Sequence, residues 1–145
     1  MTTRRNTFRK YERLTRRKII SQLFKEGKVY RAGNIRAIWL ETQLPVKSSP
    51  VQVLISVPRK QWKRSVDRNF IKRLIREAYR TNKHNLYETL ERQGKQLALA
   101  LIFRGNHKPT LQNIEQNIKQ ILAHIEQDTT KPNSDDEKKR NWKTA

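Results

Sequence analysis

The sequence predicts a single domain of mixed α/β class, a sandwich in which one β-sheet is packed by helices. Along its 145 residues, segments with apolar residues at helical spacing alternate with segments of strand-like alternation. One further segment, 96–103, is apolar on both faces, as expected of an internal strand covered on both sides. A chain of this length forms one modest core. We expect the domain to span 11–127, between a flexible basic arm at 1–10 and a disordered tail at 128–145.

The first predicted helix begins at Thr15 as N-cap and ends at Gly27, with an apolar stripe made by Ile19, Ile20, Leu23 and Phe24. NIRAIWLE at 34–41 and VQVLISV at 51–57 then alternate as strands, and a third short strand is possible near Val29 or in the 40s. A helix from about 65 to 83, the apolar strand and a last helix from about 110 to 127 complete the order α-β-β-(β)-α-β-α.

The charge is the dominant feature of the composition, because 33 Lys and Arg against 13 Asp and Glu give a formal net charge of +20. Such a charge opposes compaction and favours a polyanionic partner. Two alternatives are that the charge serves only solubility, or that it binds an anionic membrane surface. With no cysteine and no long apolar run, the chain is expected to be soluble and cytoplasmic.

The cations are concentrated in residues 59–83, which hold ten Lys or Arg against two acids. On the predicted helix, cations recur every four residues at Arg68, Lys72, Arg76 and Arg80, with Arg73 beside them. Neighbouring cations on this face are roughly 4–6 Å apart, similar to the spacing of phosphates on a nucleic acid strand. Guanidinium groups suit this role because they hold two phosphate oxygens at once. Asn69 adds a donor and an acceptor for base edges or 2′-hydroxyls. The opposite stripe, expected to face the core, contains Phe70, Ile71, Leu74, Ile75 and Ala78. We therefore predict an RNA-binding helix rather than an ordinary solvated face.

A second basic cluster surrounds the first helix and comprises Arg13, Arg16, Arg17, Lys18, Lys25, Lys28 and Arg31. For this cluster, general solubility is a stronger alternative to RNA binding than it is for the helix at 65–83.

Catalytic chemistry is hard to find in the sequence. The four glycines form no nucleotide-binding loop, and the three histidines lack metal-ligand spacing. Asp67 and Glu77 are ten residues apart and fall on different sides of their helix. We expect Asp67 to complement the helix N-terminus and Glu77 to pair with a neighbouring cation. The protein itself is predicted to be non-catalytic.

The segment RNFIKRLIREAYR at 68–80 resembles the signature helix of the bacterial ribonuclease P protein family, Arg-Asn-Arg-x-Lys-Arg-x-x-Arg-Glu. SVPRK at 56–60 matches the strand end that precedes it, and the similarity covers roughly residues 12–126. One position departs from the pattern, since Phe70 stands where the family usually has arginine. The contribution of that arginine would be lost here or supplied by Lys63 or Arg64, and Phe70 would then extend the core stripe.

The resemblance implies a fold like the second domain of ribosomal protein S5, with a left-handed β-α-β crossover that sequence patterns alone would not predict. It also implies that the chain is the protein subunit of an enzyme that removes the 5′ leader from precursor tRNA. The ribonuclease P RNA would be the catalyst and would bind Mg²⁺, while the protein alone binds no cofactor. Expected partners are this RNA and precursor tRNA, with no membrane and no small-molecule substrate.

Carried over by residue, the resemblance assigns RNA gripping to Arg68, Asn69, Lys72, Arg73 and Arg76. A leader cleft between the sheet and the first helix would contain Ile20 and Phe24, with Ile38 or Trp39 from the strand and Arg59 and Lys60 at the rim. Stacking of single-stranded bases on such side chains is physically reasonable, although Ile20 and Phe24 would also suit a plain core. The alternative function is a ribosomal or other RNA-binding protein of similar fold, without this cleft and without a role in tRNA processing. A membrane-surface protein is disfavoured because the apolar helix faces are needed for the core.

Overall fold

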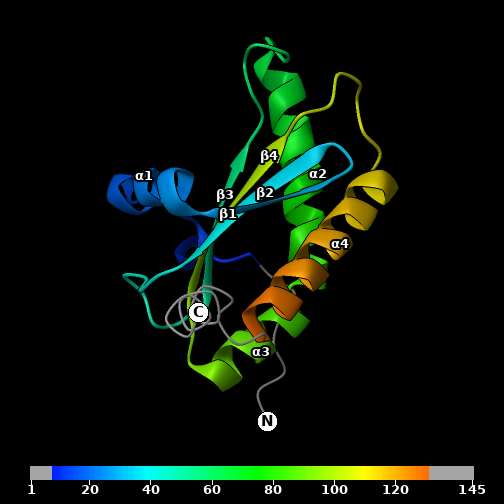
Figure 1. The fold of residues 1–145 in the computed structure, drawn as a ribbon. Coiled ribbons are helices and arrows are strands. Elements are labelled where there is room, and N and C mark those ends of the chain that lie inside the picture. The colour runs from blue at the N-terminus through cyan, green and yellow to red at the C-terminus, as the bar shows by residue number, and fades with distance from the viewer. Residues whose placement is uncertain (1–7, 131–145) are drawn as a thin grey trace, which may run out of the picture.

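The computed structural model describes residues 8–130, which form one four-stranded sheet, four α-helices and a short 3-10 turn (Figure 1). In chain order the elements are η1 (Lys10–Glu12), α1 (Arg17–Glu26), β1 (Lys28–Ala32), β2 (Ile35–Glu41), β3 (Val51–Ser56), α2 (Ser65–Asn82), α3 (His84–Gln93), β4 (Leu97–Phe103) and α4 (Leu111–Thr130). Residues 1–7 of the expected basic arm and 131–145 of the expected tail lie outside the described residues, so these parts stay predictions. Residues 128–130 were expected in the disordered tail but form the end of α4, where Thr129 is buried.

The sheet has the strand order β1-β2-β4-β3, with β3 and β4 parallel and the other neighbours antiparallel. The predicted mixed α/β architecture is thereby confirmed. All seven residues of β4 are buried, which confirms the prediction of an internal strand covered on both faces. Because β3 and β4 are parallel neighbours, the chain between them must cross the sheet, and α2 and α3 form that crossover. The left-handed sense of this crossover stays a prediction.

Two elements differ from the sequence-based expectation, and the existence of a third was uncertain from the sequence. No element was expected at 84–93, where α3 buries Leu86, Tyr87 and Leu90 and ends at Gly94 with φ of 65°. Thr15 is not the N-cap of α1, because the helix begins at Arg17 and its N-cap residue makes no side-chain capping bond. The short strand suspected near Val29 is present as β1.

The two faces of the sheet are covered by different helices, α1 on one side and α2 and α4 on the other (Figure 1). The larger apolar cluster lies under α2, α3 and α4 and includes Trp39, Ile75 and Phe103. The smaller cluster lies under α1 and includes Leu23 and Ile38. Both faces of β2 are therefore buried, with Trp39 on the α2/α4 side and Ile38 on the α1 side.

The segment before α1 is fixed along the free edge of β3. The amide of Leu14 donates to the carbonyl of Val53 over 2.9 Å, and Arg13 forms a bridge with the same residue. In the same segment, Glu12 forms an ion pair with Lys83, whose Nζ contacts both carboxylate oxygens at 2.8 and 2.7 Å. Both side chains of this pair are almost fully buried. This pair holds the N-terminal segment against the junction of α2 and α3.

A hydrogen-bonded chain of hydroxyls extends the buried pair. The Tyr87 hydroxyl donates to Glu12 Oε2 over 3.1 Å, and the Tyr79 and Tyr87 hydroxyls are 2.8 Å apart. Burial raises the pKa of both tyrosines, so both stay protonated inside the fold. Phe8 packs edge-on against Tyr79, which continues the anchoring up to the first described residue.

Candidate nucleic-acid interface

Helix α2 exposes its cations because its apolar positions define a single buried stripe. Ile71, Ile75, Ala78 and Tyr79 are buried and turn that stripe toward the sheet and α4. Since residues three and four apart share a helix face, the polar residues between them point outward or along the flanks. This confirms the core-facing role predicted for Ile71, Ile75 and Ala78, while Leu74 is only partly buried against the same cluster.

Not every basic residue of 59–83 is available to a ligand. Arg68 Nη1 donates to the carbonyls of Trp62 and Lys63, over 2.8 and 2.9 Å, so its guanidinium fixes the loop before the helix. The Trp62 indole in turn donates to the carbonyl of Gly105 over 3.0 Å. Lys83 is buried against Glu12 and is withdrawn from solvent. The predicted ridge is therefore shorter than the sequence pattern indicates.

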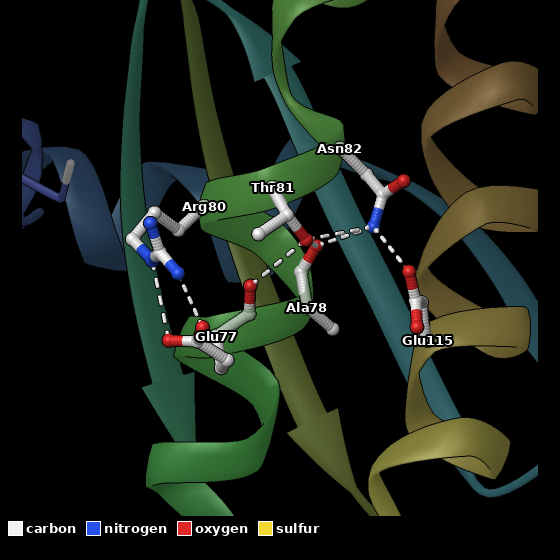
Figure 2. A network of polar contacts seen from close by, with 6 residues as sticks. All are labelled: Glu77, Ala78, Arg80, Thr81, Asn82 and Glu115. Carbon is white, nitrogen blue, oxygen red and sulfur yellow. Dashed lines mark hydrogen bonds and ion pairs between the residues drawn. The ribbon is translucent and has the colours of Figure 1, made fainter. Parts of the chain in front are cut away.

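Figure 2 shows how the end of α2 is arranged. Arg80 forms an ion pair with Glu77 one turn before it, which matches the expectation for Glu77 and lowers the pKa of that carboxyl. On the side facing α4, Asn82 donates to the carbonyl of Ala78 over 2.8 Å and reaches Glu115 at 3.5 Å. Asp67, at the first turn of α2, pairs with Lys108 over 3.1 Å.

One flank of α2 keeps its cations without acidic partners among residues 8–130. Asn69 and Arg73 are exposed, and Lys72 and Arg76 are half-buried beside β3. Lys72 and Arg76 line a pocket of about 240 Å³ together with Arg13. Its remaining lining is largely apolar and comes from the N-terminal segment and β3: Phe8, Leu14, Thr15, Val53, Leu54 and Ile55. The structure thus joins the helix cations to Arg13, which the sequence assigned only to the less certain cluster around the first helix.

Electrostatics make this pocket receptive to an anion. Burial, and then the nearby charges of Arg13 and Arg73, lower the pKa of the Arg76 guanidinium, so the three like charges disfavour one another. The Arg76 Nε is buried and has no hydrogen-bond partner within the described part of the chain. A phosphate entering the pocket would relieve the repulsion among these cations.

The four cations of the preceding loop are all exposed: Arg59, Lys60, Lys63 and Arg64. They precede the N-terminus of α2, on the path from β3 to Ser65. Lys63 and Arg64 are the expected substitutes for the missing family arginine, and both are accessible for that role.

The four residues expected to form the leader cleft do not come together as a set. Ile20 and Ile38 belong to the cluster under α1, where Ile38 is only 3% exposed. Phe24 lies on the same helix and is 48% exposed. Trp39 is wrong for this role because it lies on the opposite face of the sheet, where its indole donates to Asp128 over 3.3 Å.

Phe70 differs from its expected place in the core stripe, because 43% of its surface is exposed. Val66, one turn earlier, is exposed by 67%. The stripe through Ile71, Ile75 and Ala78 is already complete, and Phe70 lies about 100° away from Ile71 around the helix. The position of the usual family arginine is therefore a solvent-facing position here, occupied by an aromatic ring.

Among residues 8–130 no three His, Cys, Asp or Glu side chains gather as a metal site, and no helix is long and apolar enough to cross a bilayer. His124 stacks on Tyr30 at 4.0 Å between ring centroids, on the α4 side of the sheet and away from the α2 flank.

Comparison with known proteins places this geometry in a family. The family model described as Ribonuclease P matches residues 8–126. A ribonuclease P protein component of Chlorobium phaeobacteroides is 35% identical over 129 residues, covering 83% of this chain and 88% of the relative. One from Porphyromonas gingivalis is 34% identical, covering 80% and 84%.

Solved structures agree in fold. The RNase P protein of Staphylococcus aureus superposes with a TM-score of 0.62 at 20% identity, over 79% of this chain and 94% of that one. The RNase P protein from Thermotoga maritima gives 0.61 at 22% identity, over 78% and 96%. At these identities the superpositions establish the fold alone.

Proposed function

Because the chain belongs to the ribonuclease P protein family, and is thus the protein subunit of that enzyme, we propose that α2 and its adjoining pocket bind RNA. The RNA-gripping group is Asn69, Lys72, Arg73 and Arg76, with Arg13 added from the N-terminal segment. Arg68 acts indirectly by holding the loop that carries Arg59, Lys60, Lys63 and Arg64. Ribonuclease P RNA and precursor tRNA are the proposed partners.

The observation that carries the proposal is the pocket beside β3. Three cations line it, while within residues 8–130 no acidic side chain lines it and the buried Arg76 Nε has no hydrogen-bond partner. Cations beside apolar side chains suit a single strand of RNA, since phosphates meet the former and unpaired bases stack or pack on the latter. A neutral or basic ligand would leave the repulsion among the cations unrelieved.

The pocket also offers a route for the 5′ leader. Leu14 and Leu54 line the pocket and belong to the apolar cluster under α1, which also holds Ile20 and Ile38. Phe24 is exposed on that helix. We propose that the leader runs from the pocket across this face, with Phe24 as a stacking platform and Ile38 as support beneath it.

Catalysis in this proposal belongs to the RNA subunit, which also holds Mg²⁺. The protein contributes positively charged and apolar surface that positions the leader, and none of its described side chains is assigned a bond-making step.

The experiment measures precursor tRNA cleavage by the ribonuclease P RNA of Porphyromonas gingivalis at low Mg²⁺ concentration, with and without this protein. The protein should restore cleavage, and RNA affinity should fall on replacing Arg73 and Arg76 by alanine. The slope of log affinity against log salt should flatten by about 0.7–0.9 for each phosphate that the variant no longer binds. Arg92→Ala, an exposed arginine on α3, is the matched control. Failure to restore cleavage, with RNA binding intact, would show that RNA bound by α2 and its pocket is not positioned for cleavage.

A second measurement tests the leader route. Phe24→Ala should weaken binding of precursor tRNA by about 5- to 100-fold while sparing mature tRNA, because only the precursor has bases to stack on the ring. Leu111→Ala, which removes a comparably exposed side chain from α4, should affect neither ligand. Equal losses for precursor and mature tRNA would remove Phe24 from the leader route.

A further inference from the structure

Phe70 is the one position where this chain departs from the family motif, and the structure leaves its ring accessible. The large aromatic side chain of Phe70 keeps 43% of its surface exposed on α2, so part of the ring is open to a ligand. Its neighbours one turn away are Val66, Asp67, Arg73 and Leu74, of which Arg73 is an exposed cation. The ring therefore lies at the edge of the positively charged surface of α2.

The ring faces a different direction from the pocket. Helical spacing separates Phe70 from Lys72 by about 160° around α2, but from Arg73 by only about 60°. A strand held in the pocket by Lys72 and Arg76 would run beside β3, on the side of α2 away from Phe70. RNA that reaches Phe70 must instead approach the outer face, where Asn69 and Arg73 are both exposed.

We propose that Phe70 stacks on an unpaired base of the ribonuclease P RNA while Arg73, one turn further along α2, binds the adjoining phosphate. This inference rests on the proposed function and assigns its outer-face contact. An aromatic ring gives a base a stacking surface without sequence preference, and a neighbouring guanidinium supplies the charge that the ring lacks. In this chain, stacking thus replaces a contact that a motif arginine would make through its charge.

An RNA base is favoured over a second copy of the chain as the occupant because of charge. The surface around Phe70 belongs to a protein of net charge +20, and two such surfaces would repel each other. The polyanionic RNA attracts the same surface, and its loops and bulges present unstacked bases.

The test uses the full chain and a transcript of the Porphyromonas gingivalis ribonuclease P RNA, with affinity measured at several salt concentrations. Phe70→Ala should weaken binding by about 5- to 100-fold at every salt concentration without changing the salt slope, because the same phosphates stay bound. Phe70→Trp should retain affinity. Phe70→Leu should behave like alanine, because it keeps apolar volume but has no ring. Leu111→Ala, exposed to the same degree on α4, is the control.

The variants separate the possible failures. Phe70→Ala or Phe70→Leu binding as tightly as the unaltered protein would overturn the stacking contact. A steeper salt slope for Phe70→Arg would show that a phosphate is within reach of this position. If the unaltered protein fails to bind the transcript, or Arg73→Ala leaves the slope unchanged, the proposed function itself fails. Flattening by Arg73→Ala with no effect of Phe70→Ala would leave that function standing and remove only the stacking.

Discussion

Replacing Lys83 by methionine should be among the most destabilising single changes outside the apolar core. The side chains of Lys83 and Glu12 are only 4% and 5% exposed, and the ammonium contacts both carboxylate oxygens. Methionine keeps most of the volume but leaves the Glu12 carboxylate buried with the Tyr87 hydroxyl as a neutral partner. Breaking a buried pair in this way costs about 3–5 kcal/mol.

Urea unfolding at neutral pH measures this loss. With a dependence of roughly 1–3 kcal/mol per molar urea, the midpoint should fall by at least about 1 M. The matched control is Lys119→Met, which breaks the exposed pair with Glu115 on α4 and should cost no more than about 0.5 kcal/mol.

The double variant Glu12→Leu with Lys83→Met tests the reason for the cost. It removes both charges together and should recover most of the lost stability, since apolar replacements of buried pairs are often neutral. If Lys83→Met costs as little as Lys119→Met, the pair is not desolvated as described. A double variant no more stable than Lys83→Met would show that packing, rather than the unpaired carboxylate, causes the loss.

Two further changes test other parts of the fold. Burial raises the pKa of Tyr79 and Tyr87 above the ordinary value of 10.0, so the unfolded chain loses these protons first and unfolding free energy falls as pH rises above that value. Tyr79→Phe removes one of these groups, so above pH 10 the unfolding free energy should fall less steeply with pH, by ~1.4 kcal/mol per pH unit. Urea unfolding at several pH values above 10 measures this slope, and an unchanged slope would contradict the raised pKa of Tyr79. Gly94→Ala should cost about 1 kcal/mol in thermal or urea unfolding, because φ is 65° and the added methyl meets no neighbour within 4 Å. Gly94→Asn should cost less, and equal losses for the two variants would argue against backbone strain.

Sequence patterns predicted the elements whose burial is one-sided or complete. The strand at 97–103 is apolar throughout and lies inside the sheet, and the stripe of α2 through Ile71 and Ile75 faces the core. Helix α3 was missed although Leu86, Tyr87 and Leu90 have helical spacing, because polar residues on either side make the stripe short. In β2 both faces are buried, so alternation could not show that Ile38, rather than Trp39, lies under α1.

The candidate site was predicted in part. The cations of α2 could be found because they recur at helical spacing, and Lys72, Arg73 and Arg76 keep the accessible flank that this spacing implies. The pairing of Lys83 with Glu12 joins residues 71 positions apart, which no local pattern can indicate. Phe8 and Arg13 were not placed at the site for the same reason, since the chain brings them to α2 only by running along β3.

The placement of the acids explains why the α2 flank stays positive. Several acids of the described residues form ion pairs with cations away from the pocket, among them Lys28–Asp128, Arg80–Glu77, Lys83–Glu12, Lys95–Glu41, Lys108–Asp67 and Lys119–Glu115. None includes Arg13, Lys72, Arg73 or Arg76. The fold thus concentrates uncompensated charge where the apolar lining of the pocket lies. A carboxylate brought to this flank would compete with phosphate for the same donors. Thr15→Asp, in the pocket lining, should therefore weaken RNA binding more than Gln93→Asp, which adds the same charge at a distant site. Equal effects of the two variants would show that the location of the charge does not matter.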